Sequence, residues 1–382
     1  MNRILFISSK HTGGGHQSII KALSQQLLLL SPETAFSVID GFELGHGFLR
    51  FSSRSYDSFA IKFPALWGLI YQLSTPFKPL VNLFIARSIR KSLLKQIHIF
   101  HPDIIVSVHN LFVGSVIHIL RQEGLDIPVI SLIADLDHVT SLWADKRAKY
   151  ILCPTEESRQ RMLKAGMAKD QLILTGFPVR REFCDLNPDT PFHRPLKDRK
   201  DLSVLLISGS QGSAQVIRIA RTLLRNQNIR ITIIAGHNAH LKKTMEKALY
   251  SSSAGNRVTI YGFVREMSTR MKEADLLIMR ASPNVLMEAV NLCKPVIVTG
   301  ALRGQEARNP QFVLKYELGF VCKDVDRLPN IISALMKNHG EQLKRLAEHQ
   351  YRFRKPESAR RITERLIQTA SEAHTSRSLP IA

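Results

Sequence analysis

Two glycine-rich turns, one in each half of the chain, are placed where they could bind an anion. In the first half an apolar run at residues 4–7 leads into Gly13-Gly14-Gly15-His16 and then a helical pattern. In the second half residues 204–207 lead into Gly209-Ser210-Gln211-Gly212 and another helical pattern. A strand, a glycine turn and a helix start place backbone N–H groups and the helix dipole where an anion can sit. Neither turn has the G-x-G-x-x-G or P-loop spacing, and two ordinary turns are the alternative.

His16 and Asp135 are the candidates for moving a proton. A neutral imidazole at a helix start can accept a proton, because the positive end of the helix dipole disfavours the cation. Asp135 ends an apolar run at residues 129–134, and functional residues collect at the carboxyl ends of Rossmann-type strands. A histidine that only caps or orients its loop is the alternative for His16.

Short apolar runs alternate with helical patterns in both halves, which is typical of stacked βα units and a parallel sheet. The strands we expect are residues 3–8, 36–39, 103–108, 129–134 and 150–153, then 203–208, 230–235, 258–261, 276–279, 295–298 and 319–322. This pattern predicts an α/β protein with two Rossmann-like domains that face each other across a cleft.

A proline-rich segment sets the predicted domain boundaries. Residues 186–201 contain Pro188, Pro191 and Pro195 among charged residues and are expected to form a linker. Residues 1–185 would then be the N-terminal domain and residues 202–340 the C-terminal domain. Residues 341–382 would be basic helices and a tail.

The composition indicates a folded, strongly basic protein. The 382 residues are 44% hydrophobic, and 53 Lys+Arg against 32 Asp+Glu give a formal net charge of +21. The length favours two domains, and the composition excludes wholesale disorder. An anionic membrane, a phosphorylated small molecule or a nucleic acid would balance the charge. Nucleic acid is not expected, because the sequence lacks interleaved aromatic residues and glycines.

The cysteines and the amino terminus bear on location. Four widely separated cysteines, with no Cys/His cluster at zinc spacing, indicate a reducing compartment and no structural metal. The first apolar run is too short for a signal peptide, and no stretch of about 18 residues is apolar enough to span a bilayer. We therefore expect a cytoplasmic protein.

Residues 56–99 suit a membrane surface. The aromatic residues Phe63, Trp67, Tyr71 and Phe77 are interspersed with lysines and arginines. Apolar side chains with a basic rim can dip below lipid headgroups and bind anionic lipid. Ordinary core helices with basic outer faces are the alternative.

Motifs along the chain resemble a known family. They are Gly13-Gly14-Gly15-His16, then Ile133-Ala134-Asp135-Leu136 running to Trp143, then Thr175-Gly176-Phe177-Pro178-Val179-Arg180, then Gly304-Gln305-Glu306 with Asn309. In this order they resemble the monogalactosyldiacylglycerol synthases and the processive diacylglycerol glucosyltransferases, which have the two-domain GT-B fold. The residues from Ser208 to Gly212, and Arg280 eight residues before Glu288, are similar to the N-acetylglucosaminyltransferase that makes the lipid-linked peptidoglycan precursor.

The resemblance implies transfer of a hexose from a UDP-sugar to diacylglycerol. His16 would act in catalysis with Asp135 assisting, Gly13 to Gly15 would form the acceptor loop, and Glu288 would bind the ribose hydroxyls. A solvated helix glutamate is the alternative for Glu288. The other implied donor-binding residues are Gly209, Ser210, Gln211, Gly212, Arg280, Ser282, Gln305, Glu306 and Asn309. No cofactor is implied, and no metal is expected although Asp135-Leu136-Asp137 has the D-x-D pattern of metal-dependent transferases.

The sequence departs from the family pattern twice at the site. Thr140 stands where a histidine is expected beyond Asp135, and His138 lies at a different offset. Residues 281–285 replace glycines and a threonine that let the backbone approach a diphosphate, and Pro283 lacks an N–H. Ser282 can cap the helix and supply the missing hydroxyl.

We therefore expect a glycosyltransferase that is peripheral on the inner face of the cell membrane and makes a monoglycosyldiacylglycerol. The alternative within the same fold uses a polyprenyl-linked or glycolipid acceptor. The alternative from another class, a lipid- or nucleotide-binding pseudoenzyme, is favoured by residues 281–285.

Overall fold

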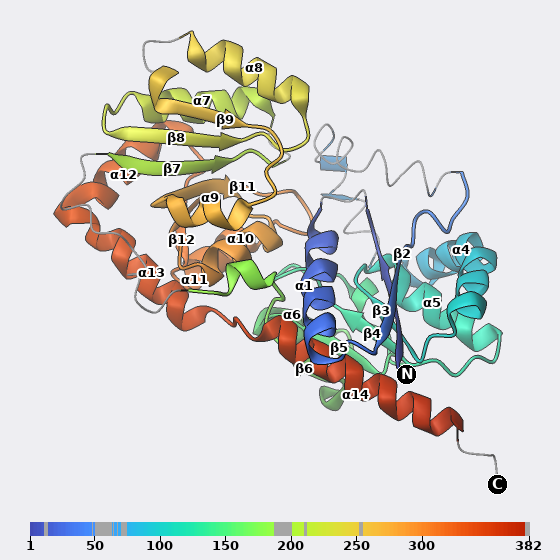
Figure 1. The fold of residues 1–382 in the computed structure, drawn as a ribbon. Coiled ribbons are helices and arrows are strands. Elements are labelled where there is room, and N and C mark those ends of the chain that lie inside the picture. The colour runs from blue at the N-terminus through green and yellow to red at the C-terminus, as the bar shows by residue number, and fades with distance from the viewer. Residues whose placement is uncertain are drawn as a thin grey trace. The chain divides into compact units, whose positions relative to one another are not determined.

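The chain forms two compact units in a computed structural model (Figure 1). The structure describes residues 1–10, 14–47, 49, 63, 65–66, 68–69, 75–186, 201–209, 212–251 and 255–378. Unit 1 comprises Met1–Arg181, Arg303–Glu306 and Lys355–Ala382, and unit 2 comprises Glu182–Leu302 and Ala307–Arg354.

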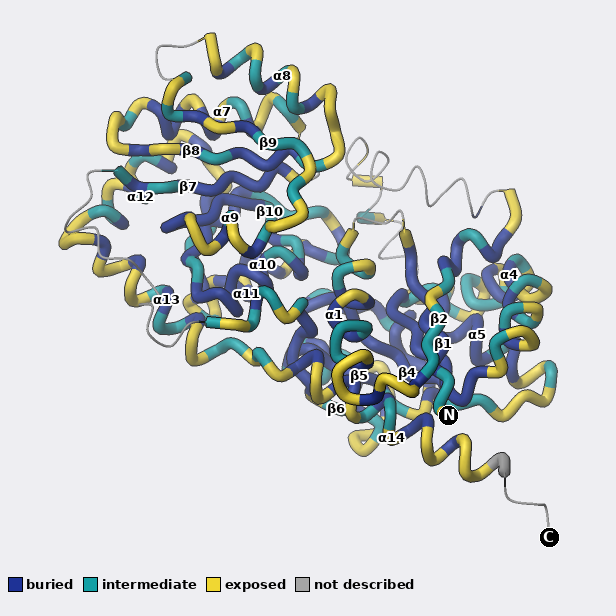
Figure 2. Tube along the Cα trace, in the orientation of Figure 1, coloured by how far each residue is buried: buried dark blue, intermediate teal, exposed yellow. Residues whose placement is uncertain are grey.

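Unit 1 is built on a six-stranded parallel sheet with the strand order β2-β1-β3-β4-β5-β6. The strands are β1 (Arg3–Ser8), β2 (Ala35–Asp40), β3 (Ile104–Ser107), β4 (Val129–Leu132), β5 (Tyr150–Cys153) and β6 (Leu172–Leu174). The helices are α1 (Gly15–Leu30), α4 (Lys78–Phe100), α5 (Leu111–Gln122), α6 (Glu156–Lys164) and α14 (Ser358–Ser378). Strands β3 and β4 are buried along their whole length (Figure 2), because parallel strands covered by helices are apolar on both faces.

Unit 2 has a second six-stranded parallel sheet, with the order β12-β11-β10-β7-β8-β9. The strands are β7 (Leu202–Ile207), β8 (Ile229–Ile234), β9 (Val258–Tyr261), β10 (Leu276–Arg280), β11 (Val296–Gly300) and β12 (Gly319–Val321). The helices are α7 (Ser213–Leu224), α8 (Ala239–Tyr250), α9 (Met267–Glu273), α10 (Pro283–Asn291), α11 (Asn309–Lys315), α12 (Leu328–Met336) and α13 (Glu341–Phe353).

Short 3₁₀ helices connect some of these elements. They are η1 (Ser141–Trp143), η2 (Lys169–Gln171), η3 (Arg181–Phe183), η5 (Gly255–Arg257), η6 (Val325–Arg327) and η7 (Lys337–Gly340).

Each of the eleven predicted strands is present, with ends shifted by at most a few residues. The structure adds β6, which the sequence analysis missed. Its three residues, Leu172–Leu174, pair in parallel with β5 at the edge of the sheet. Three residues are too few for an apolar run to stand out from its surroundings.

Gly176 gives part of the 175–180 motif a structural role. Its φ of +81° is one that residues with side chains rarely adopt. A Cβ at this position would lie 2.1 Å from Ser358 Oγ and 2.9 Å from Lys355 Cβ. The motif therefore leaves room for the first turn of α14, which packs on α1 and on the strands β1 and β3. Near its end, His374 Nδ1 lies 3.0 Å from the Asp103 carboxylate.

Both sheets reverse their strand order next to their first strand. In unit 1 the chain adds β2 on one side of β1 and β3 on the other. In unit 2 it adds β8 and β9 on one side of β7 and β10 on the other. The carboxyl ends of strands at such a switch point diverge and leave a crevice where ligands bind. The two switch points, β1/β3 and β7/β10, are therefore where each unit should carry its site.

Candidate active site

His16 lies at the switch point of unit 1. It is the second residue of α1, whose N-cap is Gly14 with a left-handed φ of 47°. Burial lowers the pKa of His16 from 6.5 to about 4, and the main-chain carbonyl of Val108 opposes this shift. Among the described residues, the buried Nδ1 atom has no hydrogen-bond partner. The imidazole is therefore neutral at physiological pH and has the form that accepts a proton.

His109 lies next to His16, and the sequence analysis missed it. It follows β3 by two residues, and its ring centroid is 4.9 Å from that of His16. Burial, and then the charge of His16, hold the pKa of His109 well below 6.5. The signal was present in the sequence, because a histidine directly after a predicted strand obeys the same rule that singled out Asp135.

Asp135 lies three residues beyond β4, and it is buried. Its Oδ2 atom accepts a hydrogen bond of 3.0 Å from the indole Nε1 of Trp143. Burial raises the pKa of Asp135 from 3.8 to about 7; the Trp143 hydrogen bond opposes the shift, and the charge of Glu306 adds to it. Asp135 is thus a carboxyl group that titrates near neutral pH.

The second aspartate of the D-x-D pattern, Asp137, forms an ion pair with a basic side chain. Asp137 Oδ1 lies 3.2 Å from the Arg161 guanidinium, and the Asp137 side chain is 8% exposed. In the described part of the chain, no group of three or more His, Cys, Asp or Glu side chains is arranged to hold a metal ion.

The loop at residues 303–306 belongs to unit 1, although the sequence placed Gln305 and Glu306 with the donor-binding residues of the C-terminal half. The ring of His138 bonds to the main-chain oxygen of Gly304. Glu306 is 2% exposed and acts on the pKa of Asp135. The predicted residues Asp135 and Glu306 are therefore brought together, in unit 1.

A small hollow adjoins this part of unit 1. It has a volume of about 300 Å³, and its lining includes His138, Thr140, Ser141, Arg161 and Lys164. Thr140, which stands at the position of the expected histidine, accepts a hydrogen bond of 3.3 Å from Asn110. Arg161 and Lys164 make the lining of the hollow basic.

The switch point of unit 2 brings together the glycine turn and Arg280. Gly209 follows β7 with a φ of +52°, and Gly212 is the N-cap of α7. Arg280 is the last residue of β10, which pairs with β7, and Ser282 is the N-cap of α10. Two helix starts and a guanidinium thus lie at one edge of the sheet, an arrangement suited to a diphosphate.

The altered segment 281–285 still forms a regular helix start. Pro283 is at the first helical position, where a missing N–H costs nothing. Leu286 N donates to Ser282 O at 3.0 Å, so the first intrahelical bond is in place. The N–H groups of Asn284 and Val285 precede this bond and point out of the helix start, as first-turn N–H groups do. Ser282 makes no side-chain capping bond, so its hydroxyl is not used by the helix.

Glu288 is buried in α10 with 4% of its surface exposed. The alternative of a solvated glutamate is therefore wrong, because α10 is buried on nearly every side. Asn309, which is fully buried at the start of α11, donates from Nδ2 to the main-chain oxygen of Ala281 at 2.8 Å. It thus ties α11 to the segment that follows β10.

An aromatic pair that the sequence analysis did not predict lies at the same edge of unit 2. His237 and Phe263, which follow β8 and β9, stack with centroids 4.0 Å apart and an interplanar angle of 17°. Phe263 is 58% exposed.

Five of the predicted site residues lie outside the described part of the chain. They are Gly13, Ser210, Gln211, Trp67 and Tyr71. The other two residues predicted to face a membrane, Phe63 and Phe77, are 55% and 52% exposed.

Two family models match the chain in succession. Residues 16–179 match the model described as monogalactosyldiacylglycerol (MGDG) synthase. Residues 203–365 match the glycosyltransferase family 28 C-terminal domain. The amino-terminal part of the chain is thus similar to MGDG synthases, and the carboxyl-terminal part is similar to family 28 glycosyltransferases. The predicted resemblance is confirmed, and the first model begins at His16.

Named members of the MGDG synthase family match nearly the whole chain. The probable chloroplastic MGDG synthase of Glycine max is 29% identical over 380 residues, which cover 94% of this chain and 70% of the relative. MGDG synthase 1 of Arabidopsis thaliana, also chloroplastic, is 29% identical over 381 residues, with 94% and 69% covered.

Solved structures confirm the predicted GT-B fold. MurG of Acinetobacter baumannii has a TM-score of 0.62 and 17% identity, and the match covers 96% of this chain and 99% of MurG. The spinosyn rhamnosyltransferase SpnG in complex with thymidine diphosphate has a TM-score of 0.61 and 12% identity, with 95% and 100% covered.

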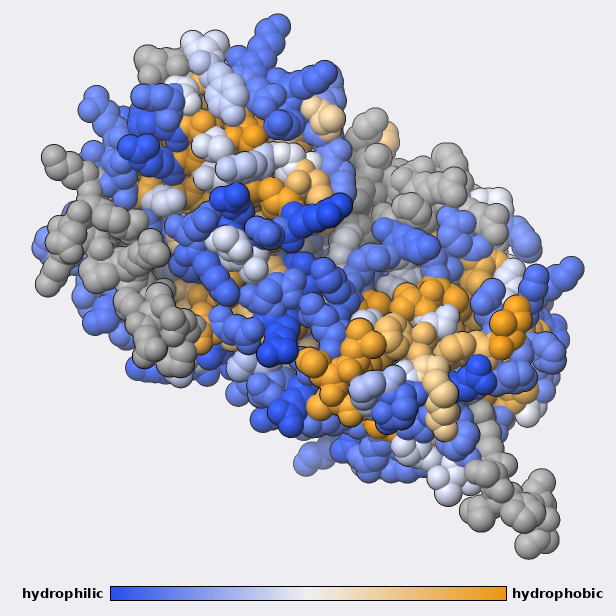
Figure 3. Space-filling view, viewed as in Figure 1, coloured by the Kyte–Doolittle hydropathy of each residue, from blue (hydrophilic) through white to orange (hydrophobic). Residues whose placement is uncertain are grey.

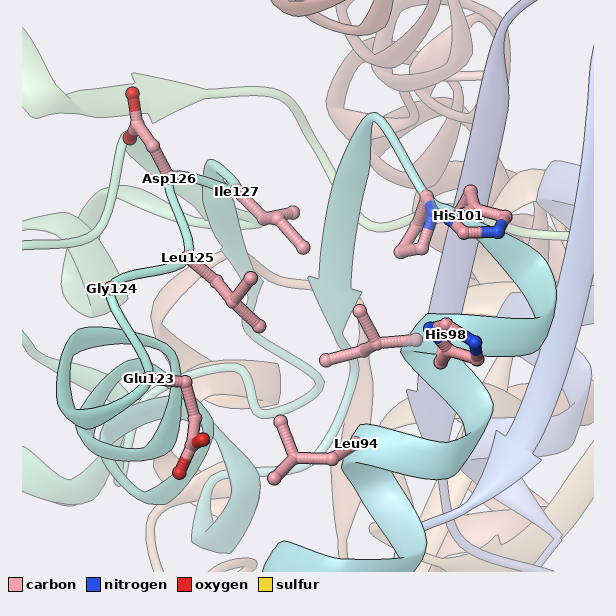
Figure 4. Close-up of a pocket in the computed structure, with 10 residues that line it drawn as sticks. Leu94, His98, His101, Glu123, Gly124, Leu125, Asp126 and Ile127 are labelled. Atoms are coloured by element: carbon pink, nitrogen blue, oxygen red, sulfur yellow. The ribbon is translucent and has the colours of Figure 1, made fainter.

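The protein also has features away from its switch points. A groove of about 550 Å³ lies between the end of α4 and the loop after α5 (Figure 4). His98 and His101 stand on one wall and Glu123 and Asp126 on the other. These segments precede β3 and β4, so the groove opens at the amino ends of the strands, opposite to His16. In the part of the chain that is described, we find no helix that is both long and apolar enough to cross a bilayer.

Proposed function

We propose that the protein transfers a hexose from a UDP-sugar to diacylglycerol and so makes a monoglycosyldiacylglycerol. The observation that carries the proposal is the neutral imidazole of His16 at the β1/β3 switch point. The family match, and relatives named as MGDG synthases, support this acceptor and product.

In the proposed reaction His16 accepts the proton of the diacylglycerol hydroxyl. The hydroxyl oxygen attacks the anomeric carbon while the bond from that carbon to the UDP oxygen breaks, which inverts the anomeric centre. A base with a pKa of about 4 is weak, but it is fully deprotonated at neutral pH and is placed at a helix start that disfavours its cation. General-base catalysis of this kind contributes about 10²- to 10⁴-fold to a rate. Asp135, a carboxyl group that titrates near neutral pH, would assist.

Unit 2 would bind the UDP-sugar. The amino ends of α7 and α10 and the guanidinium of Arg280 would face the diphosphate and stabilise the charge on departing UDP. The buried carboxylate of Glu288 can accept two hydrogen bonds, which fits the two ribose hydroxyls. We expect Gly209 to let the backbone approach the phosphates, because its φ is left-handed.

The outer face of α4 supports a membrane surface as the working location. Leu80 and Phe84 are 63% and 54% exposed, and Arg87, Lys91 and Lys95 are exposed further along the helix. The spacing of three or four residues puts all five on one stripe of the helix. Apolar side chains can enter the headgroup region while the basic ones contact anionic lipid. We propose that the protein is peripheral on the inner face of the membrane, where reducing conditions suit its four cysteines, none of which forms a disulfide.

The apolar surface in Figure 3 is a second place to which lipid could bind, and it is a less suitable one. It lies over α1 and β2, whose exposed apolar residues are Leu28, Leu29, Leu30 and Val38. The three leucines end α1, at the side of the sheet away from His16. A lipid held there would present its hydroxyl far from the proposed base, so we assign the membrane to α4.

The test is UDP release from a panel of UDP-sugars on vesicles with and without diacylglycerol. We expect release with one sugar that requires diacylglycerol and is lost in Glu288→Ala, while the exposed control Glu273→Ala retains it. Release that requires a polyprenyl-linked sugar or a glycolipid instead would move the acceptor to that class. Binding of UDP and vesicles without any release would indicate the pseudoenzyme and contradict the proposal.

A further inference from the structure

We propose that His109 is a positioning residue that holds the imidazole of His16 in the orientation in which it accepts a proton. This inference rests on the proposed role of His16 and adds a residue to that site. It is carried by four features of His109: its fixed backbone, its fixed tautomer, its aromatic packing and its lack of charge.

The backbone of His109 is fixed at the strand end next to His16. Val108 N donates to Ile7 O at 2.9 Å, which ties the segment after β3 to β1. Ser107 Oγ donates to the main-chain oxygen of His109, also at 2.9 Å. The backbone that carries the ring is therefore held by hydrogen bonds to the strands that form the switch point.

One hydrogen bond fixes the tautomer of His109. Leu111 N lies 3.3 Å from His109 Nδ1. A backbone N–H can only donate, so Nδ1 carries the lone pair and the neutral ring has its proton on Nε2. This bond also closes the start of α5 over the ring and restricts its rotation.

Aromatic packing makes His109 one wall of the pocket for His16. Its ring contacts Phe42 edge-to-face, with centroids 5.1 Å apart and an angle of 86°. It contacts Phe112 at 5.3 Å and His16 at 4.9 Å, each with an angle of 46°. With 8% of its surface exposed, His109 is too enclosed to receive a proton from a substrate itself.

Packing against His109 adds to the hydrogen bond that the His16 ring donates to the main-chain carbonyl of Val108. The Nδ1 atom of His16, where a triad histidine would donate to a carboxylate, has no hydrogen-bond partner among the described residues. A carboxylate there would raise the pKa of the imidazole, whereas a neutral ring orients it without favouring the cation.

The carboxylate of Asp40 is hydrogen-bonded to groups other than His16 and His109. The carboxylate that follows β2, Asp40, accepts hydrogen bonds from the N–H groups of Lys10 and Phe42. Within the described ranges, the charge of His16 is the one that acts on the pKa of His109. His109 thus supplies a rigid and uncharged support for the proposed base.

Two substitutions test separately what the ring of His109 and its hydrogen bond contribute. His109→Asn keeps an acceptor for Leu111 N but removes the aromatic wall, and His109→Phe keeps the wall but removes the acceptor. The matched control is His118→Asn, the same chemical change on α5 at a half-buried histidine that contacts neither ring. Each is assayed for sugar transfer and for carbethoxylation of His16, read by peptide mass spectrometry between pH 5.5 and 7.5.

We expect His109→Asn to lower kcat about tenfold or more with KM for the UDP-sugar unchanged, because only the proton acceptor is misplaced. His109→Phe should recover most of kcat, and His118→Asn should match the wild type. In the wild type, carbethoxylation of His16 should be constant over this pH range, since its pKa is about 4. In His109→Asn the pKa should move toward 6.5, so the rate should fall about tenfold from pH 7.5 to 5.5.

Wild-type kcat in His109→Asn, or a His109→Phe protein as impaired as His109→Asn, would overturn the proposal. The proposal would also be overturned if His16 in the wild type titrated near pH 6.5. This measurement uses the wild type alone, so it does not depend on the folding of a variant. Carbethoxylation requires no sugar transfer, so a silent transfer assay with the expected His16 titration would count against the proposed function and not against His109.

Discussion

Replacing Asp135 by asparagine should stabilise unit 1 more at pH 8 than at pH 5. Burial raises the pKa of Asp135 from 3.8 to about 7 in the folded protein. Because the folded state binds this proton more tightly than the unfolded state, stability falls as pH rises from about 4 to 7 and is level outside that window. Asparagine does not titrate, and its Oδ1 atom can still accept the hydrogen bond from Trp143 Nε1.

The size of the effect follows from the two pKa values. A difference of one pKa unit between the folded and unfolded states changes the free energy of unfolding by about 1.4 kcal/mol. Most of this pH-dependent change falls between pH 5 and pH 8. Integrating from 3.8 in the unfolded state to about 7 in the folded state gives a change of about 3 kcal/mol over this interval. The gain in stability from Asp135→Asn should therefore be about 3 kcal/mol larger at pH 8 than at pH 5.

The assay is urea unfolding followed by tryptophan fluorescence. Trp143 is buried in unit 1 and donates a hydrogen bond to Asp135, so its fluorescence reports on that unit. Asp126→Asn, at an exposed carboxylate of the same unit, is the control and should show a difference of a few tenths of a kcal/mol at most. An Asp135→Asn effect that is equal at both pH values, or larger at pH 5, would refute the reasoning.

Gly176→Ala should destabilise the protein by about 2 kcal/mol or more, because a Cβ would collide with the first turn of α14 at a left-handed φ; an unchanged thermal unfolding midpoint would contradict this. Glu288→Gln should weaken UDP binding about tenfold or more in calorimetry, since a buried charged acceptor is lost, and Glu273→Gln should not; equal affinities for UDP would remove Glu288 from the donor site. The double variant Leu80→Asp and Phe84→Asp should bind anionic vesicles at least tenfold more weakly in sedimentation while unfolding like the wild type; undiminished binding would move the membrane surface away from α4.

The fold was predictable because local signals agree with the global topology. Apolar runs bounded by turns located eleven strands, and glycine turns located the starts of α1 and α7. Their alternation with helical patterns requires parallel pairing, because each crossover contains a helix. The three residues of β6 carry too little signal, and their strand conformation depends on pairing with β5.

Part of the site was predictable from one rule, namely that functional residues lie at the carboxyl ends of parallel strands. That rule identified Asp135, and applied to β3 it would also have identified His109. The glycine turn identified His16, and the family resemblance pointed to Arg280. The rule could not locate Glu306, whose loop follows β11 in sequence but is grouped with unit 1. Nor could periodicity reveal that Glu288 is buried, because burial of α10 on nearly every side depends on the surrounding elements.

The central claim is that His16 accepts the proton when a hexose passes to diacylglycerol. The most direct measurement is the initial rate of glycolipid formation by His16→Ala on diacylglycerol vesicles, with the UDP affinity of the same protein measured alongside. We expect a rate about 10²- to 10⁴-fold below wild type with unchanged UDP affinity. A His16→Ala protein that forms glycolipid at the wild-type rate would contradict it.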